Sequence, residues 1–169
     1  MGNTVVIRGV GCWTPPHSIS NEELVEGYNA YADMFNQQHA AEIASGEIPA
    51  KPHSSAEFIE KASGIKSRYI YCKEGVLDIQ RMRPLIPERG DDEISQQAEI
   101  AVEAAKLALQ SANLTGEDID AVIVSCAYTQ RSYPAIAIEV QDALKIQGFG
   151  FDMLVAFSAA TIGFHLAPK

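Results

Sequence analysis

One stretch near the end of the printed sequence constrains the fold more than any other. Residues 148–161 predict a buried strand from Phe151 to Val155, a tight turn of small residues, and a helix beginning near Ser158. Many α/β enzymes display a nucleophile at such a sharp strand-to-helix turn. The helix N-terminus there offers free N–H groups and its positive dipole end to a developing negative charge. The residue at this turn is Phe157, which cannot act as a nucleophile. The sequence therefore predicts the setting of a nucleophile without the nucleophile.

The order of the other predicted elements indicates an α/β fold. A β-branched run over 4–11 predicts the first strand, and the nearly continuous apolar run over 119–126 predicts a strand buried on both faces. An alanine-rich stripe over 98–112 predicts a long amphipathic helix that ends at Asn113, and a further helix begins at Pro134. Strands that alternate with helices predict a mostly parallel sheet covered on both sides.

Local signals organise the first half of the chain. Ser20 and Glu23 form a capping box that opens one helix, and Ser-Ser-Ala-Glu at 54–57 is a second capping box that opens a short helix ending at Gly64. Residues 65–72 alternate enough to predict a strand or hairpin arm.

Two stretches interrupt this pattern as excursions. Residues 29–52 are alanine-rich and helix-prone, with breaks at Gly46 and Pro49, and residues 74–90 carry prolines, glycine and several charges. The second stretch therefore predicts a surface loop.

Composition excludes several classes of protein. A net charge of −9 without a Lys/Arg cluster argues against a nucleic-acid or anionic-membrane partner. No apolar run approaches the roughly 20 residues that span a bilayer, and the first residues lack the pattern of a signal peptide. Cys12, Cys72 and Cys126 are odd in number and far apart, which favours reduced thiols over disulfides or a zinc site. We expect a cytoplasmic chain of 169 residues, with no metal and no cofactor.

Four segments, in order and spanning essentially the whole chain, resemble β-ketoacyl-acyl-carrier-protein synthase III. Ala-Ser-Gly-Ile-Lys-Ser-Arg at 62–68 is similar to the Thr-Gly-Ile-x-x-Arg segment of that family. Residues 101–124 resemble its long helix and following strand, and residues 133–144 its Pro-led helix. Residues 151–159 resemble the Phe-Asp-x-x-x-Ala-Cys turn that carries the acylated cysteine. The excursions at 29–52 and 74–90 look like a long-chain-type subgroup rather than the acetyl-CoA-primed type.

This resemblance implies a thiolase-like fold, in which residues 1–169 are an N-terminal three-layer αβα half with a mostly parallel five-stranded sheet. The C-terminal half is absent from the sequence. Members of the family usually form homodimers through the edge strand that corresponds to residues 151–155. They load an acyl group from acyl-CoA or acyl carrier protein onto the cysteine and join it to malonyl-acyl carrier protein with loss of carbon dioxide. A histidine and an asparagine of the second half assist that step.

The sequence departs from the family pattern in three ways. Phe157 occupies the cysteine position, so no thioester can form there. The sequence ends at Lys169, where the family continues for about as many residues again. Phe58 and Ala62 occupy the positions of the tryptophan and arginine that clamp the CoA adenine in acetyl-CoA-primed relatives, so Phe58 retains only a ring for weak stacking.

Each candidate residue has a structural alternative. Ser158 is a substitute nucleophile or, by the preference of helix N-termini for serine, a cap. Tyr133 is either the family's aromatic that crosses the dimer interface to line the partner's acyl tunnel or an exposed tyrosine before a proline. Cys126 fits a small buried hydrophobe better than a reactive thiol. Phe157 either fills the space of the acyl chain and sulfur or is an inactivating substitution, and its small neighbours favour the second reading.

Two functions stay open at this point. The first is the N-terminal part of a synthase III-type acyltransferase, inactive as this chain. The second is a non-catalytic partner that pairs through residues 151–155 with a full-length synthase or with a separately encoded second half.

Overall fold

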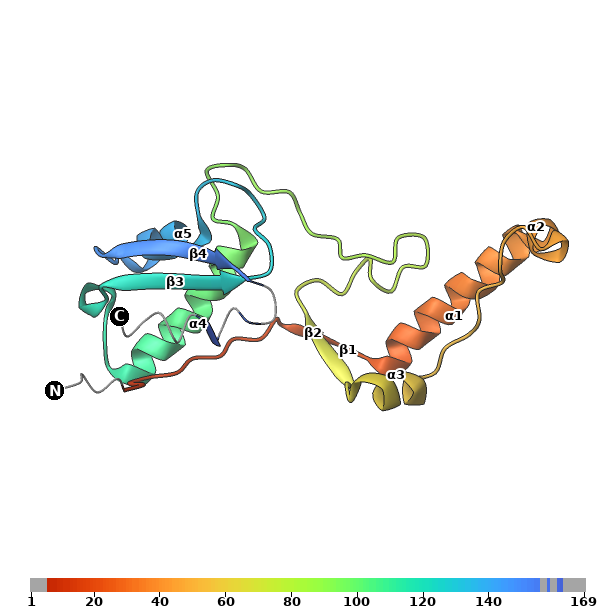
Figure 1. Cartoon of the computed structure of the whole chain (residues 1–169), viewed down its shortest axis with the longest axis horizontal. Coiled ribbons are helices and arrows are strands. Elements are labelled where there is room, and N and C mark those ends of the chain that lie inside the picture. The colour runs from red at the N-terminus through yellow and green to blue at the C-terminus, as the bar shows by residue number, and fades with distance from the viewer. Residues whose placement is uncertain (1–5, 156–157, 159–160, 163–169) are drawn as a thin grey trace. The chain divides into compact units, whose positions relative to one another are not determined.

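The computed structural model describes residues 6–155, 158, 161 and 162, which fall into two compact units (Figure 1). The antiparallel-sheet unit comprises residues 14–88. The parallel-sheet unit comprises the described residues of 1–13 and 89–169. Each unit is described by itself below. No helix in the described part of the chain is both long enough and apolar enough to cross a membrane.

The antiparallel-sheet unit pairs two short strands beside three helices. Its elements are β1 (His17–Ser20), α1 (Asn21–Gln38), α2 (Ala40–Ser45), α3 (Ala56–Ser63) and β2 (Ser67–Ile70). β1 pairs antiparallel with β2, so that His17 lies opposite Ile70. The strand predicted over 65–72 is confirmed in its middle, whereas β1 was not predicted because its four residues follow two prolines and show no β-branched run.

The capping box predicted at the start of α1 is confirmed. The Ser20 hydroxyl accepts a hydrogen bond from the Glu23 N–H at 3.2 Å, and the Glu23 carboxylate accepts one from the Ser20 N–H at 3.0 Å. The Glu23 carboxylate also pairs with the Lys73 ammonium at 2.5 Å. The hydrogen bond from Lys73, followed by that from the Ser20 N–H, lowers the pKa of Glu23 from 4.5.

Substituting Glu23 with glutamine should remove a pH-dependent part of the stability. A carboxyl group whose pKa is lower in the folded state stabilises the fold above its unfolded pKa. That stabilisation disappears as the pH falls through the folded value. We therefore expect a lower urea midpoint for Glu23→Gln than for wild type at pH 7 and converging midpoints as the pH falls below about 4, measured by far-UV circular dichroism. Equal midpoints at pH 7 would refute this assignment.

The capping box predicted at 54–57 does not form, and the cap of α3 lies one residue later than predicted. The N-cap of α3 is Ser55, whose hydroxyl accepts from the Phe58 N–H at 3.1 Å, and Gly64 ends the helix at φ 73° as predicted. Ser54 is unavailable as the cap because its N–H donates to the Asn29 side chain at 2.9 Å and its carbonyl accepts from that side chain at 3.1 Å.

The excursion at 29–52 is a helical arm, and the chain that returns along it is hydrogen-bonded to α1. α1 continues to Gln38, α2 follows, and Gly46 turns the chain at φ 80°. Two asparagine side chains of α1 then hydrogen-bond the returning backbone. Asn29 bonds the N–H and the carbonyl of Ser54, and Asn36 bonds the N–H and the carbonyl of Lys51. Residues 74–90 contain no helix or strand, as expected for a surface loop.

The parallel-sheet unit is a βαβ arrangement with one additional long helix. Its elements are α4 (Gln96–Ala112), the 3₁₀ turn η1 (Gly116–Asp118), β3 (Ala121–Cys126), α5 (Ile136–Leu144) and β4 (Phe149–Leu154). β3 and β4 run parallel and in register from Ala121 opposite Phe149 to Cys126 opposite Leu154, and α5 is the crossover between them (Figure 1). As predicted, α4 ends at Asn113, which adopts φ 56°.

The core of this unit lies between α4, α5 and one face of the sheet. Ala98 and Val102 of α4 pack with Ile136 and Val140 of α5, and alternate residues of β3 complete the cluster: Val122, Val124 and Cys126. Alternate side chains of a strand point to opposite faces. Phe149 and Phe151 are in register with the other set, Ala121 and Ile123, and remain 63% and 39% exposed. β3 is therefore half-buried throughout, and the prediction that it is buried on both faces is wrong for the described residues.

The predicted sheet is larger than the one described. Residues 6–11 form no strand, so the predicted first strand over 4–11 is wrong there, and residues 4 and 5 lie outside the described range. A strand needs a hydrogen-bonded neighbour, and this segment instead lies against α4. A Cβ on Gly9 or Gly11 would come within 2.4 or 2.2 Å of the Ala108 or Ala104 carbonyl oxygen. Two two-stranded sheets, rather than one five-stranded sheet in three layers, are found among the described residues.

Candidate functional site

The structure describes three of the four predicted site residues. Phe157 lies outside the described residues. Ser158 is exposed, and its carbonyl accepts a hydrogen bond from the Ile162 N–H at 3.0 Å. Tyr133 is 88% exposed in the loop before α5. Phe58 is 66% exposed on α3 and belongs to the antiparallel-sheet unit, so its position is described only within that unit.

β4, the strand that precedes the predicted nucleophile position, is hydrogen-bonded to α5 near both of its ends. Near its carboxyl end the Asp152 carboxylate accepts from the backbone N–H groups of Ile136 and Ala137, each at 2.8 Å. Near its start the Gln141 side chain donates to the Gly148 carbonyl at 2.9 Å. The first turn of a helix has unsatisfied donors, and no side chain of Ala135 can cap them, so Asp152 caps α5 from another element. These bonds fix the position and direction of β4 relative to α5.

The end of β3 places a thiol beside the end of β4. Cys126 lies opposite Leu154 in the parallel register and packs against the core cluster. Burial, and then the negative charge of Asp152, raise the pKa of the Cys126 thiol above its usual value. Nucleophilic cysteines have depressed pKa values, so Cys126 is a protonated packing residue and does not replace a nucleophile at position 157.

A buried charged network anchors the loop that carries Tyr133. The Glu139 side chain is 7% exposed and accepts from the Ser95 N–H at 2.7 Å, the Ser95 hydroxyl at 2.6 Å and the Arg131 guanidinium at 2.7 Å. The Ser95 hydroxyl in turn caps α4 through the Ala98 N–H. Arg131 also donates to backbone carbonyls of the segment before α4, among them that of Glu93. One carboxylate therefore joins the starts of α4 and α5 to the loop between β3 and α5.

The same loop is held a second time by glutamine side chains. Gln97 donates to the Tyr128 carbonyl at 2.8 Å and accepts from the Gln130 N–H at 2.6 Å, while the Gln130 side chain accepts from the Gln96 N–H at 3.0 Å. Tyr128 is 69% exposed. The loop therefore presents two exposed tyrosines, Tyr128 and Tyr133, from an anchored backbone.

Sequence reasoning missed the residues that build this arrangement. The role of Asp152 could have been predicted, because aspartate is depleted in strands and an aspartate within an apolar strand sequence needs a hydrogen-bond partner. No sequence pattern predicted the pairing of Glu139 with Arg131, because two charged residues eight positions apart look like ordinary surface residues in the sequence. Among the described residues no group of three or more His, Cys, Asp or Glu could hold a metal ion.

Comparisons with known proteins agree on one family. The chain is 56% identical over 143 residues to a β-ketodecanoyl-[acyl-carrier-protein] synthase of Pseudomonas aeruginosa, covering 85% of this chain and 41% of that protein. It is 25% identical over 162 residues to a β-ketoacyl-[acyl-carrier-protein] synthase III of Granulibacter bethesdensis, covering 95% of this chain and 37% of that protein. The chain thus spans less than half the length of these relatives. No family model matches it.

Solved structures give the same answer for the fold. A 3-oxoacyl-[acyl-carrier-protein] synthase III from Aquifex aeolicus matches with a TM-score of 0.62 at 25% identity, over 95% of this chain and 38% of that one. An OleA variant from Xanthomonas campestris matches with a TM-score of 0.67 at 20% identity, over 99% of this chain and 40% of that one. The chain is α/β with thiolase-like structural neighbours, and it belongs to the β-ketoacyl-[acyl-carrier-protein] synthase III family.

Proposed function

We propose that this chain is the N-terminal part of a condensing enzyme that joins an acyl thioester to malonyl-acyl carrier protein with loss of carbon dioxide. The 56% identity to a β-ketodecanoyl-[acyl-carrier-protein] synthase over 143 residues carries the proposal. Acyl-CoA and acyl carrier protein are the candidate donors, with Phe58, Tyr133 and Ser158 as candidate substrate-contacting residues. The five-stranded, three-layer half that the family resemblance implies is part of the same proposal.

The proposed chain is inactive by itself for a chemical reason. A thioester intermediate needs a thiolate at the turn, and position 157 holds a phenylalanine. The chain covers 41% of the Pseudomonas relative, and the histidine and asparagine that assist the reaction in the family are expected in the part that it does not cover. The fastening of β4 by Asp152 and Gln141 supports a turn held ready for a side chain of the right chemistry.

Restoring the thiol tests this function. Phe157→Cys, co-expressed with the remaining segment of the Pseudomonas relative, should take up one decanoyl group from decanoyl-CoA, because the thiolate is then placed at a helix N-terminus. Intact-mass spectrometry detects the adduct, and peptide mapping should locate it at position 157. Phe157→Ala with the same segment is the matched control and should stay unmodified. If Phe157→Cys also stays unmodified while the intact relative is acylated, the proposed function is wrong.

A non-catalytic partner subunit is the alternative. The exposed Phe149 and Phe151 favour it, since their rings stack at 6.5 Å on a sheet face that no described element covers. β4 is also an edge strand among the described residues, which supports pairing with a second copy or with a full-length synthase. Stable association of the wild-type chain with the intact relative, together with failure of Phe157→Cys to be acylated, would favour this alternative.

A further inference from the structure

The loop at residues 80–88 of the antiparallel-sheet unit exposes apolar side chains and arginines together. Every residue of this loop is exposed. Leu85 and Ile86, which are 52% and 45% exposed, are adjacent and lie between Pro84 and Pro87. Scattered exposed apolar residues are ordinary on a protein surface, whereas adjacent ones indicate a surface that a partner covers.

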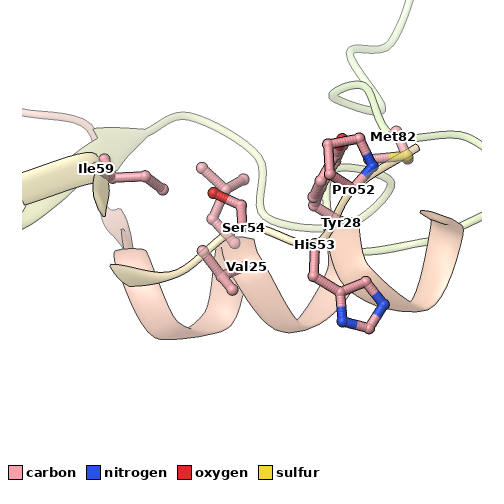
Figure 2. Close-up of a pocket in the computed structure, with 8 residues that line it drawn as sticks. Val25, Tyr28, Pro52, His53, Ser54, Ile59 and Met82 are labelled. Carbon is pink, nitrogen blue, oxygen red and sulfur yellow. The ribbon is translucent and has the colours of Figure 1, made fainter. Parts of the chain in front are cut away.

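This loop is held against the rest of its unit. Met82, which adopts φ 50°, lines a largely apolar pocket together with Tyr28 and Pro52 (Figure 2). The Gln80 side chain donates a hydrogen bond to the Met34 sulfur of α1 at 3.2 Å. The two exposed apolar side chains are therefore presented from a backbone that is anchored nearby on the inner side.

The loop also has few backbone donors that burial would leave unpaired. Its two prolines have no N–H. The N–H of Arg83 donates to the Gly75 carbonyl at 3.0 Å, and the N–H of Leu85 donates to the Glu74 carbonyl at 3.2 Å. An unpaired backbone N–H is costly to transfer out of water, so this loop enters a less polar environment at a lower cost than an ordinary loop.

Two arginines give the loop a positive charge within an acidic chain. Arg81 and Arg83 are exposed, and no acidic residue lies between Asp78 and Glu88. Neither arginine forms a salt bridge within the described part of the chain. The net charge of −9 argues against an anionic membrane for the chain as a whole. However, exposed charges more than about 8 Å away are largely screened at physiological salt, so the charge of the loop itself decides the contact.

We propose that this loop binds the surface of a membrane that contains anionic lipids. Leu85 and Ile86 enter the boundary between the headgroups and the acyl chains, and Arg81 and Arg83 bind the lipid phosphates. Arginine suits this position because its aliphatic stem lies along apolar surface while the guanidinium stays among the headgroups. The contact is peripheral and reversible, and the proposal does not depend on the condensing activity.

A membrane fits this loop better than an acidic protein does. A stable protein complex buries about 800 Å² on each partner with matched shapes, and two apolar side chains on a short loop do not supply such an area. A fluid lipid surface needs no matched shape. Its headgroup region also accepts apolar side chains and cations at the same depth.

Flotation of the whole chain with lipid vesicles tests the proposal. The chain should float with vesicles of phosphatidylcholine that contain about 30% phosphatidylglycerol, and its affinity for pure phosphatidylcholine should be at least roughly tenfold lower, since each arginine near an anionic surface contributes about fivefold. Raising the salt concentration should weaken the binding to the anionic vesicles.

The apolar contact has its own variants. Leu85→Ser combined with Ile86→Ser should lower the affinity for the anionic vesicles at least roughly tenfold, because both side chains lose their burial in the membrane. Ile65→Ser combined with Tyr69→Ser is the matched control, since these residues of the same unit are 46% and 64% exposed, and it should float as wild type does. This control separates the loop from general adhesion of exposed apolar surface.

The arginines are tested at constant net charge. Arg81→Gln combined with Arg83→Gln should lower the affinity for the anionic vesicles about 10- to 30-fold, whereas Arg81→Lys combined with Arg83→Lys should retain most of it. Lys61→Gln combined with Lys66→Gln changes the net charge of the chain equally and should have the smaller effect.

The proposal is overturned if the wild-type chain does not float with the anionic vesicles, which leaves an acidic protein as the occupant of the loop. It is also overturned if the serine variant or the glutamine variant of the loop floats as wild type does.

Discussion

Replacing Glu139 with alanine should lower the free energy of unfolding of the parallel-sheet unit by about 3–5 kcal/mol, the usual cost of removing one partner from a buried ion pair. The Glu139 side chain is 7% exposed and the Arg131 side chain 19%. Without the carboxylate, the Ser95 N–H and hydroxyl lose their acceptors in a place that water reaches poorly, and the guanidinium loses its counter-charge. Such a loss is a large share of the stability of an ordinary domain.

Urea unfolding followed by the fluorescence of Trp13, the single tryptophan and a member of this unit, measures the effect. Asp142→Ala is the matched control on the same helix, because that carboxylate is 85% exposed and pairs with the exposed Lys145. It should cost less than about 0.5 kcal/mol. The double variant Glu139→Met with Arg131→Met should be more stable than Glu139→Ala, since it leaves no unpaired buried charge. If Glu139→Ala and Asp142→Ala are equally mild, the network does not anchor the loop.

Substituting Asp152 with alanine should cost about 2–3 kcal/mol in the same assay. Two backbone N–H groups at the start of α5 lose a charged acceptor at 2.8 Å, and an N-cap alone contributes about 0.5–2 kcal/mol. The helix dipole adds to the loss, because the carboxylate lies at its positive end. Asp152→Asn should lose less than Asp152→Ala, since an amide oxygen still accepts one of the two bonds.

The control for this prediction is Asp120→Asn, which alters an exposed aspartate just before β3 and should be nearly silent. A second measurement separates positioning from stability. In the acylation assay, Phe157→Cys combined with Asp152→Asn should be labelled more slowly than Phe157→Cys at a temperature where both are folded, because β4 then enters the turn less rigidly. Equal labelling rates would show that Asp152 serves stability alone.

Several elements could be predicted because their signals are local. The Ser20 and Glu23 capping box, the helix end at Asn113 and the left-handed Gly64 each depend on residues within one or two turns of the chain, and the structure confirms all three. The cap of α3 was predicted one residue early because Ser54 and Ser55 are equivalent in sequence. Asn29, 25 positions away, is what removes Ser54 from competition.

Pairing and burial could not be predicted in this way. The run over 4–11 has the composition of a strand, yet its described residues lie against α4, because a strand also needs a partner that no local pattern supplies. β3 looked buried on both faces because its residues are apolar, but only the face carrying Val122 and Val124 is covered by described helices.

The sequence by itself determined the local elements, the family resemblance and the chemical fact that position 157 holds a phenylalanine where a thiol would be needed. Only the tertiary structure decided which polar side chains hold β4, α5 and the preceding loop together. Asp152 caps α5 from a strand, Gln141 bonds the Gly148 carbonyl, and Glu139 joins two helix starts to Arg131. Caps and turns can be predicted from a few neighbouring residues. The role of a buried polar group depends on partners distant in the sequence that folding brings beside it.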